Sequence, residues 1–150
     1  PNDGEVDLRP CMHACWKLNN ASALHTSLPV LHPVCKGHLL FLRYSEKTPM
    51  RVNKYNIEEP ILACSDVIPT FHHQVILMPL VGFDASGNRL GMGGGYYDRT
   101  LASIQAQIIK PKLIGIAHDC QQVDQLPVQH WDIPVNAIVT PTQQLSFNRT

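Results

Sequence analysis

Apolar residues along this chain gather in short runs, separated by polar stretches that contain glycine and proline. Five runs have the length of β-strands, namely residues 28–31, 39–44, 75–80, 112–117 and 137–140. The run at 75–80 is also partly β-branched, which favours a strand. Residues 51–60 and 65–73 show no such run, and we expect a loop and a connection there.

Two segments carry helix signals. Residues 9–20 place Pro10 in a first helical turn, where proline is tolerated, and end at an asparagine pair. Farther along, Leu101, Ile104 and Ile108 recur at three- and four-residue spacing. Strands that alternate with helices favour an α/β layered sheet, mostly parallel and flanked by helices. A chain of 150 residues is long enough for one domain with its own core.

The segment 75–98 joins a strand, a glycine-rich loop and the start of a helix. A turn signal at 84–87 follows the strand, and Arg89 and the glycine-rich stretch 91–95 come next. Glycines let backbone N–H groups approach a phosphate closely, and a helix N-terminus favours anions. Arg89 adds a fixed positive charge, and Asp98 is placed to hold a divalent cation that accompanies phosphates. The segment therefore indicates a nucleotide phosphate site.

This pattern differs from the two best-known phosphate-binding motifs. Nothing in the chain reads G-x-x-x-x-G-K-[ST], and the last position of G-x-G-x-x-G falls on Tyr96. On residue type alone, a glycine-rich turn without a ligand remains an alternative. Three consecutive glycines weaken that alternative, because such a loop is entropically costly to order and a ligand helps explain it.

Charge and cysteine content exclude several classes of function. Twelve basic and twelve acidic side chains balance, so there is no electrostatic case for binding nucleic acid or an anionic membrane. No apolar run reaches transmembrane length. Five cysteines at irregular spacing are typical of reduced thiols, not of a disulfide framework. We expect a cytoplasmic protein that acts on small molecules.

Two other residue pairs are candidates for chemistry. Cys11 and Cys15 would share a helical face, but two ligands are weak support for a metal site, and buried free cysteines are common in cores. His118 and Asp119 follow the run at 112–117. They could form an acid/base pair, although adjacent residues in an extended segment point in opposite directions. A structural or substrate-facing role for them is equally open.

The stretch FDASGNRLGMGGGYYDR, residues 83–99, strongly resembles the signature of 5-formyltetrahydrofolate cyclo-ligases, also called 5,10-methenyltetrahydrofolate synthetases. Other segments that resemble the bacterial branch are 5–7, 28–33, 55–60, 115–120 and 130–134. The resemblance implies a three-layer Rossmann-like α/β fold of the kind shared with sugar-phosphate isomerases and CoA transferases. Family members usually carry an N-terminal helix and a first strand, so residues 1–150 are expected to be a single cyclo-ligase domain without that segment.

The resemblance also implies a reaction and its site. The reaction is ATP- and Mg²⁺-dependent cyclisation of 5-formyltetrahydrofolate to 5,10-methenyltetrahydrofolate with release of ADP and phosphate, in one-carbon folate metabolism. No residue is expected to act as a covalent catalyst. The implied ATP-binding residues are Arg89, Leu90, Gly91, Met92, Gly93, Gly94, Gly95, Tyr96 and Tyr97. The implied folate-binding residues are Glu5, Tyr55, Tyr96 and Tyr97, and Asp98 and Asp132 are the implied magnesium ligands.

Two alternatives stay open at this point. The chain could be a non-catalytic fragment that binds folate or nucleotide. It could also be a sugar-phosphate isomerase or a CoA-transferase-like enzyme of the same architecture. An isomerase would work without ATP, and a CoA transferase would require a glutamate nucleophile.

Overall fold

The computed structural model describes residues 4–18 and 24–147. Its α-helices are α1 (Arg9–Leu18) and α2 (Tyr96–Ala102). Its strands are β1 (Thr26–Leu31), β2 (Leu39–Tyr44), β3 (Met50–Val52), β4 (Glu58–Pro60), β5 (Val67–Ile68), β6 (Val75–Pro79), β7 (Gly82–Phe83), β8 (Arg89–Leu90), β9 (Lys112–Ile116), β10 (Ala137–Val139) and β11 (Gln144–Ser146). Single 3-10 turns occur at Cys64–Asp66, Thr70–His72 and Asp119–Gln121.

The largest sheet has the strand order β11-β10-β9-β6. Strands β6, β9 and β10 are parallel, and β11 joins them antiparallel. Helix α2 lies on the crossover from β6 to β9, the usual way to connect parallel neighbours. Alternate residues of β6, Ile76 and Met78, are buried in the main core with Leu101 of α2 and Ile138 of β10. The packed elements β6 and α2 therefore flank the segment that contains the glycine-rich loop.

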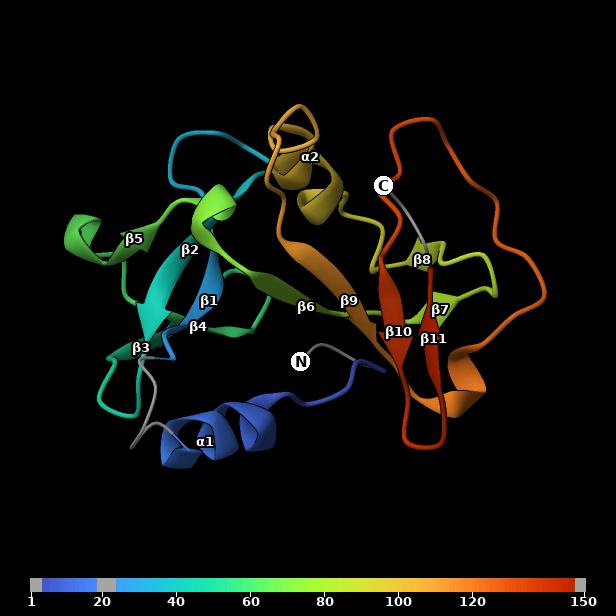
Figure 1. Ribbon diagram of the computed structural model, residues 1–150. Helices are drawn as coiled ribbons and strands as arrows, with labels where there is room; N and C mark the ends of the chain where they lie inside the picture. The colour runs from blue at the N-terminus through green and yellow to red at the C-terminus, as the bar shows by residue number, and fades with distance from the viewer. Residues whose placement is uncertain (1–3, 19–23, 148–150) are drawn as a thin grey trace.

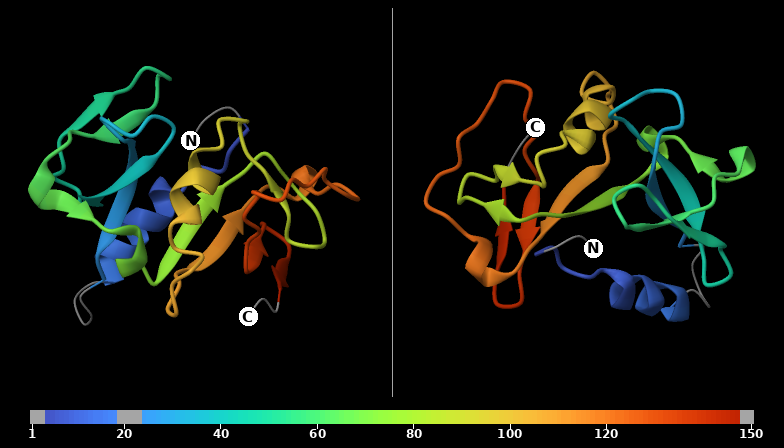
Figure 2. Two further views of the ribbon diagram at one scale, coloured as in Figure 1. Left: turned by 90° about the horizontal axis from the view of Figure 1, so that it is seen from above. Right: turned by 180° about the vertical axis from the view of Figure 1, so that it is seen from behind.

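Strands β1, β2 and β5 form a separate antiparallel sheet, and β3 pairs with β4 in a hairpin. In Figure 1 these strands lie on one side of β6, and β7 to β11 lie on the other. The views in Figure 2 also place α1 and α2 on opposite sides of the molecule. The expected parallel pairing is thus limited to three strands, and the architecture is α/β with mixed sheets.

The strands expected at 28–31, 39–44, 75–80, 112–117 and 137–140 are all present, with bounds that agree within two residues. The loop expected at 51–60 is wrong, because its ends pair as β3 and β4. The connection expected at 65–73 contains β5, and β11 was not expected.

Both helices have the expected starting region, and α2 ends earlier than expected. Helix α1 is described from Arg9 to Leu18, and its expected end at residues 19–20 lies outside the described part of the chain. Helix α2 ends at Ala102. Leu101 and Ile104 are buried, whereas Ile108 lies beyond the helix and is fully exposed. Neither described α-helix has the length and apolar character needed to cross a bilayer. All five cysteines are free thiols.

Candidate functional site

A cleft of about 1710 Å³ lies among α1, β1, the β3–β4 hairpin, the glycine-rich loop and the segment 126–134. Its lining includes every residue that the resemblance implies for the site, namely Glu5, Tyr55, Arg89, Leu90, Gly91, Met92, Gly93, Gly94, Gly95, Tyr96, Tyr97, Asp98 and Asp132. These residues are up to 127 positions apart in sequence. The fold therefore brings them to one place, large enough for two ligands of drug size.

The glycine-rich loop has a backbone shape that needs glycine at two positions. Gly93 has φ +81°, and Gly95, which caps the N-terminus of α2, has φ +60°. The guanidinium of Arg99 donates from Nε to the carbonyl of Gly37 at 2.9 Å and from Nη2 to the carbonyl of Gly94. Arg99 thus fastens the loop to the connection between β1 and β2. The sequence reading missed this role.

Arg89 and Asp98 form an ion pair at the base of the loop. Arg89 Nη2 lies 2.6 Å from Asp98 Oδ1, and the two side chains are only 9% and 18% exposed. The same oxygen accepts the backbone N–H of Ile133 at 3.0 Å. Arg89 Nε is buried and has no hydrogen-bond partner among the described residues. A buried donor without a partner is unusual in a native protein, and a bound ligand atom is one way to satisfy it.

Asp132 precedes Ile133 in sequence, so the contact between Ile133 and Asp98 brings the two expected magnesium ligands to neighbouring positions on the cleft wall. Asp132 Oδ2 accepts the backbone N–H of Gln129 at 2.8 Å. Among the described residues, no three His, Cys, Asp or Glu side chains form a group that could hold a metal. The protein thus offers two carboxylates here and no complete metal cage.

Three tyrosines lie on the cleft. The hydroxyls of Tyr55 and Tyr96 are 2.7 Å apart, and their rings meet edge to face. This bond lowers the pKa of Tyr55 and raises that of Tyr96, as expected when Tyr96 donates. Burial raises the pKa of Tyr97 to about 12, and the charge of Glu5 adds to the rise. Glu5 is therefore electrostatically coupled to Tyr97.

Asp84 supports this site from the turn between β7 and β8. It is 2% exposed, and its carboxylate accepts N–H groups from Ser86, Asn88 and Leu126 at 2.9 to 3.1 Å. Burial alone would raise the pKa of Asp84, but these hydrogen bonds, led by the Asn88 side chain, outweigh it and lower the pKa. The turn signal at 84–87 was correct, and the link to Leu126 was not visible from it.

His118 and Asp119 do not line the cleft. The Asp119 carboxylate accepts the hydroxyls of Thr140 and of Thr142, the second at 2.7 Å, and these bonds lower the pKa of Asp119. The turn that they begin also places the Gln121 amide, which donates to the carbonyl of Gly4 and anchors the segment that carries Glu5. Of the roles left open for this pair, the contacts of Asp119 favour the structural one.

Cys11 and Cys15 both line the cleft on one side of α1. Cys11 is exposed, so the expectation of a buried core residue is wrong at this position. Partial burial and the neighbouring Cys15 raise the pKa of the Cys11 thiol, which disfavours the thiolate that would bind a metal.

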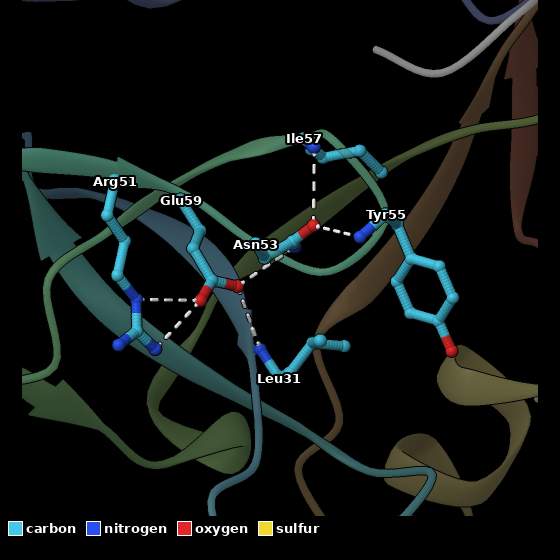
Figure 3. A network of polar contacts seen from close by, with 6 residues as sticks. All are labelled: Leu31, Arg51, Asn53, Tyr55, Ile57 and Glu59. Carbon is cyan, nitrogen blue, oxygen red and sulfur yellow. Dashed lines mark hydrogen bonds and ion pairs between the residues drawn. The ribbon is translucent and has the colours of Figure 1, made fainter.

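Glu59 is an acid that the sequence analysis did not single out. It is buried at the wall of the cleft, and Figure 3 shows its carboxylate among Arg51, Asn53 and Leu31. Glu59 belongs to a short polar strand that reads as a loop, so no sequence pattern indicated burial. A residue of the same stretch, Tyr55, was expected at the site, and the structure connects the two through Asn53.

The family model for the 5-formyltetrahydrofolate cyclo-ligase family matches residues 19–141 of this chain. The 5-formyltetrahydrofolate cyclo-ligase of Escherichia coli is 46% identical over 141 residues, which cover 94% of this chain and 74% of that protein. The cyclo-ligase of Haemophilus influenzae is 46% identical over 89% of this chain and 68% of that protein.

Two solved structures are also similar. The 5,10-methenyltetrahydrofolate synthetase of Aquifex aeolicus matches all of this chain and 70% of its own, with a TM-score of 0.76 and 30% identity. The synthetase of Mycoplasma pneumoniae matches 92% of this chain and 67% of its own, with a TM-score of 0.62 and 27% identity. Because the match extends over most of the sequence and over the fold, this chain belongs to the 5-formyltetrahydrofolate cyclo-ligase family.

Proposed function

We propose that this protein catalyses the ATP-dependent cyclisation of 5-formyltetrahydrofolate to 5,10-methenyltetrahydrofolate, with release of ADP and phosphate, in one-carbon folate metabolism. Family membership supports the reaction class. The observation that carries the proposal for this chain is the single cleft whose wall contains both the glycine-rich loop and the tyrosines. Two substrates that react with each other must meet in one cavity, and this cleft has the volume for both.

The chemistry requires activation of an oxygen that leaves poorly. The formyl oxygen attacks the γ-phosphorus of ATP and ADP departs, which gives an iminophosphate. N10 of the folate then attacks the formyl carbon, and the oxygen leaves as phosphate. The protein's work is therefore positioning of the two substrates and neutralisation of charge, without a covalent intermediate on a side chain.

Backbone N–H groups of the glycine-rich loop, residues 91–95, would bind the phosphates. Arg89 would add a positive charge, and its buried, unpartnered Nε is a donor suited to a ligand oxygen. The Glu5 carboxylate would accept N–H donors from the polar edge of the pterin. Tyr55, Tyr96 and Tyr97 would enclose the flat part of the folate and its formyl group.

Asp98 and Asp132 would hold Mg²⁺. The donor set fits this ion, because magnesium takes few protein oxygens and completes its shell with water and phosphate. In each carboxylate one oxygen accepts a backbone N–H, which fixes its orientation, and no described residue donates to the other. Bound Mg²⁺ would neutralise charge on the transferred phosphoryl group. Arg89, which pairs with Asp98, would add to this charge neutralisation.

Two finer inferences accompany this proposal. The crossover β6-α2-β9 and the parallel strand β10 support a relation to three-layer Rossmann-like folds. The five free cysteines favour a reducing compartment, and we infer a cytoplasmic location.

The direct test is to mix the protein with ATP, Mg²⁺ and 5-formyltetrahydrofolate and to follow the ultraviolet absorbance of the methenyl product. We expect the band to appear only when ATP and Mg²⁺ are both present. Omission of ATP is the matched control, because an enzyme that needs no nucleotide would give the band without it. The absence of product from folded protein with both substrates and Mg²⁺ would overturn the proposal.

A further inference from the structure

Glu59 is a buried acid in a short, polar strand. Its side chain is 3% exposed, and Oε1 accepts Arg51 Nε at 3.1 Å and Arg51 Nη2 at 2.9 Å. Arg51 lies directly opposite Glu59 in the β3–β4 pairing. A buried carboxylate is tolerated only with such partners, so its place on the wall of the cleft needs an explanation beyond the pairing of β3 with β4.

The second oxygen of Glu59 connects two other elements. Oε2 accepts the backbone N–H of Leu31, the last residue of β1, at 3.2 Å. It also accepts Asn53 Nδ2 at 3.1 Å. One carboxylate thus joins the end of β1 to the tip of the hairpin between β3 and β4, as Figure 3 shows.

Asn53 passes this constraint to the hairpin tip. Its Oδ1 accepts the backbone N–H groups of Tyr55 at 2.9 Å and of Ile57 at 3.2 Å. Asn56 in the same tip has the left-handed φ of +59°, so the turn is tight, and these bonds add to the backbone hydrogen bonds between Asn53 and Ile57 and between Asn56 and Asn53. If the Asn53 amide turned over, its oxygen would face the Glu59 carboxylate and its NH₂ would face two N–H donors. The charge of Glu59 therefore fixes the direction of the amide.

Tyr55 is the residue that this tip presents to the cleft. In Figure 3 its ring points away from Glu59, toward the ribbon of α2, where its hydroxyl meets that of Tyr96. Apart from this contact, the Tyr55 ring meets Lys54, whose Nζ lies 4.9 Å from the ring centroid. The residue is 47% exposed, so few other contacts hold its side chain. Its position depends mainly on the backbone of the tip.

We infer that Glu59 is a positioning residue for the folate part of the cleft: through Asn53 it holds the hairpin tip, residues 53–57, so that Tyr55 stands against Tyr96. The identity of the ligand rests on the proposed function, whereas the link from Glu59 to the tip does not. The two are therefore tested by separate measurements.

The first measurement is amide hydrogen exchange, residue by residue, in the protein without ligand. Glu59→Gln keeps the size of the side chain, but its NH₂ must face either Arg51 or the donors of Leu31 and Asn53. We expect the amides of Tyr55 and Ile57 to exchange about tenfold faster in this variant, with the amides of β6 unchanged. Glu58→Gln is the matched control, because Glu58 is the exposed neighbour whose ion pair, to Arg9, is 3.7 Å long. Unchanged exchange at Tyr55 and Ile57 in Glu59→Gln would overturn the inference.

Asn53→Ala tests the relay if Glu59→Gln does not fold, because it retains the pair of Glu59 with Arg51. It should give the same fast exchange at Tyr55 and Ile57. The double variant Asn53→Asp/Glu59→Gln restores the link with reversed polarity, since the new amide can donate to the new carboxylate. We expect it to recover most of the slow exchange. Normal exchange in Asn53→Ala, or no recovery in the double variant, would count against the relay.

The second measurement is the affinity for 5-formyltetrahydrofolate by calorimetry in four proteins. These are the parent, Glu59→Gln, Tyr55→Ala and the combination Tyr55→Ala/Glu59→Gln. We expect Glu59→Gln to weaken folate binding about tenfold and ATP binding less than about twofold. In the Tyr55→Ala background, Glu59→Gln should change folate affinity by less than about twofold, while the fast exchange of the Ile57 amide persists. Equal effects in both backgrounds would show that Glu59 acts elsewhere. If the parent protein neither binds folate nor forms the methenyl product, the proposed function fails, and the exchange measurements still decide the role of Glu59.

Discussion

Arg89 and Asp98 are joined at 2.6 Å beneath the glycine-rich loop, and the Asp98 oxygen that makes this contact also accepts the N–H of Ile133. Asp98 therefore has two tasks, because the same side chain neutralises a buried arginine and faces the cleft as an expected ligand of magnesium. The two tasks can be separated by comparing Asp98 with Asp132, whose carboxylate accepts the backbone N–H of Gln129 and makes no ion pair with a described residue.

Asp98→Ala should destabilise the protein by about 2–4 kcal/mol, because it leaves the guanidinium of Arg89 buried without its partner. It should also weaken binding of Mg²⁺ and ATP more than binding of folate. Urea unfolding and calorimetry measure the two effects. Asp132→Ala is the matched control, expected to cost less than about 1 kcal/mol while it weakens Mg²⁺-dependent ATP binding. Equal loss of nucleotide and folate binding in Asp98→Ala would contradict the assignment to magnesium.

Gly93→Ala should raise the KM for ATP about tenfold, through the backbone and not through crowding. A Cβ at Gly93 would meet no atom within 4 Å, but the φ of +81° costs an L-residue about 1–2 kcal/mol. Steady-state kinetics at saturating folate measures the change. Gly93→Asn is the informative comparison, since asparagine adopts left-handed φ more readily. Gly93→Asn should lose less stability than Gly93→Ala. The reverse order would show that side-chain size at this position matters more than backbone conformation.

Asp84 should make the protein sensitive to acid. Its hydrogen bonds lower the folded-state pKa, so its stabilisation is fully present above the unfolded pKa of about 4 and is lost as pH falls through the folded value. Asp84→Asn should lower stability at pH 7 by about 2–3 kcal/mol, because an amide cannot accept all of the same N–H groups. Its urea midpoint should also vary less than that of the parent as the pH falls below about 4. Parallel curves for the two proteins would refute the assignment.

Tyr97 should titrate well above the usual pKa of a tyrosine side chain. Burial and then the charge of Glu5 raise its pKa to about 12, so the folded state favours the neutral phenol. The corresponding stabilisation is complete below the unfolded pKa of about 10 and disappears as pH rises through about 12. Comparison of tyrosinate absorbance in the parent and in Tyr97→Phe isolates this group. Glu5→Gln should lower the pKa of Tyr97, and an unchanged titration in that variant would mean that the two side chains are not coupled.

The sequence predicted the parts of the fold that depend on continuous apolar runs. Strands β2 and β6 were expected within one residue of their bounds, because their core-facing positions are hydrophobic. The β3–β4 hairpin was missed, since its strands have three residues each and the partner that holds them is a charged pair, Arg51 with Glu59. Helix α2 was overextended because the spacing of Ile108 matched the buried residues, although the chain leaves the helix at Ala102.

The candidate site also has parts that the sequence indicates and parts that it does not. Its glycine-rich loop, Arg89 and Asp98 are local in sequence, and a motif can indicate them. The contact of Tyr55 with Tyr96 joins residues 41 positions apart, and the anchoring of Gly37 by Arg99 joins residues 62 apart. Such contacts depend on how the two groups of strands pack, which hydrophobic periodicity does not specify. The resemblance to a family supplied Tyr55, and only the structure supplied the residues that hold it.

The guanidinium of Arg99 donates to the carbonyls of Gly37 and Gly94, so the glycine-rich loop is already fastened in the protein without ligand. A run of glycines would otherwise sample many conformations, and a ligand would have to restrict them on arrival. Because Arg99 already holds the loop, the loss of its conformational entropy occurs when the protein folds, and not when nucleotide binds. Association with nucleotide should then be fast and should cause little rearrangement of this segment, in contrast to enzymes whose phosphate loops order around their ligand.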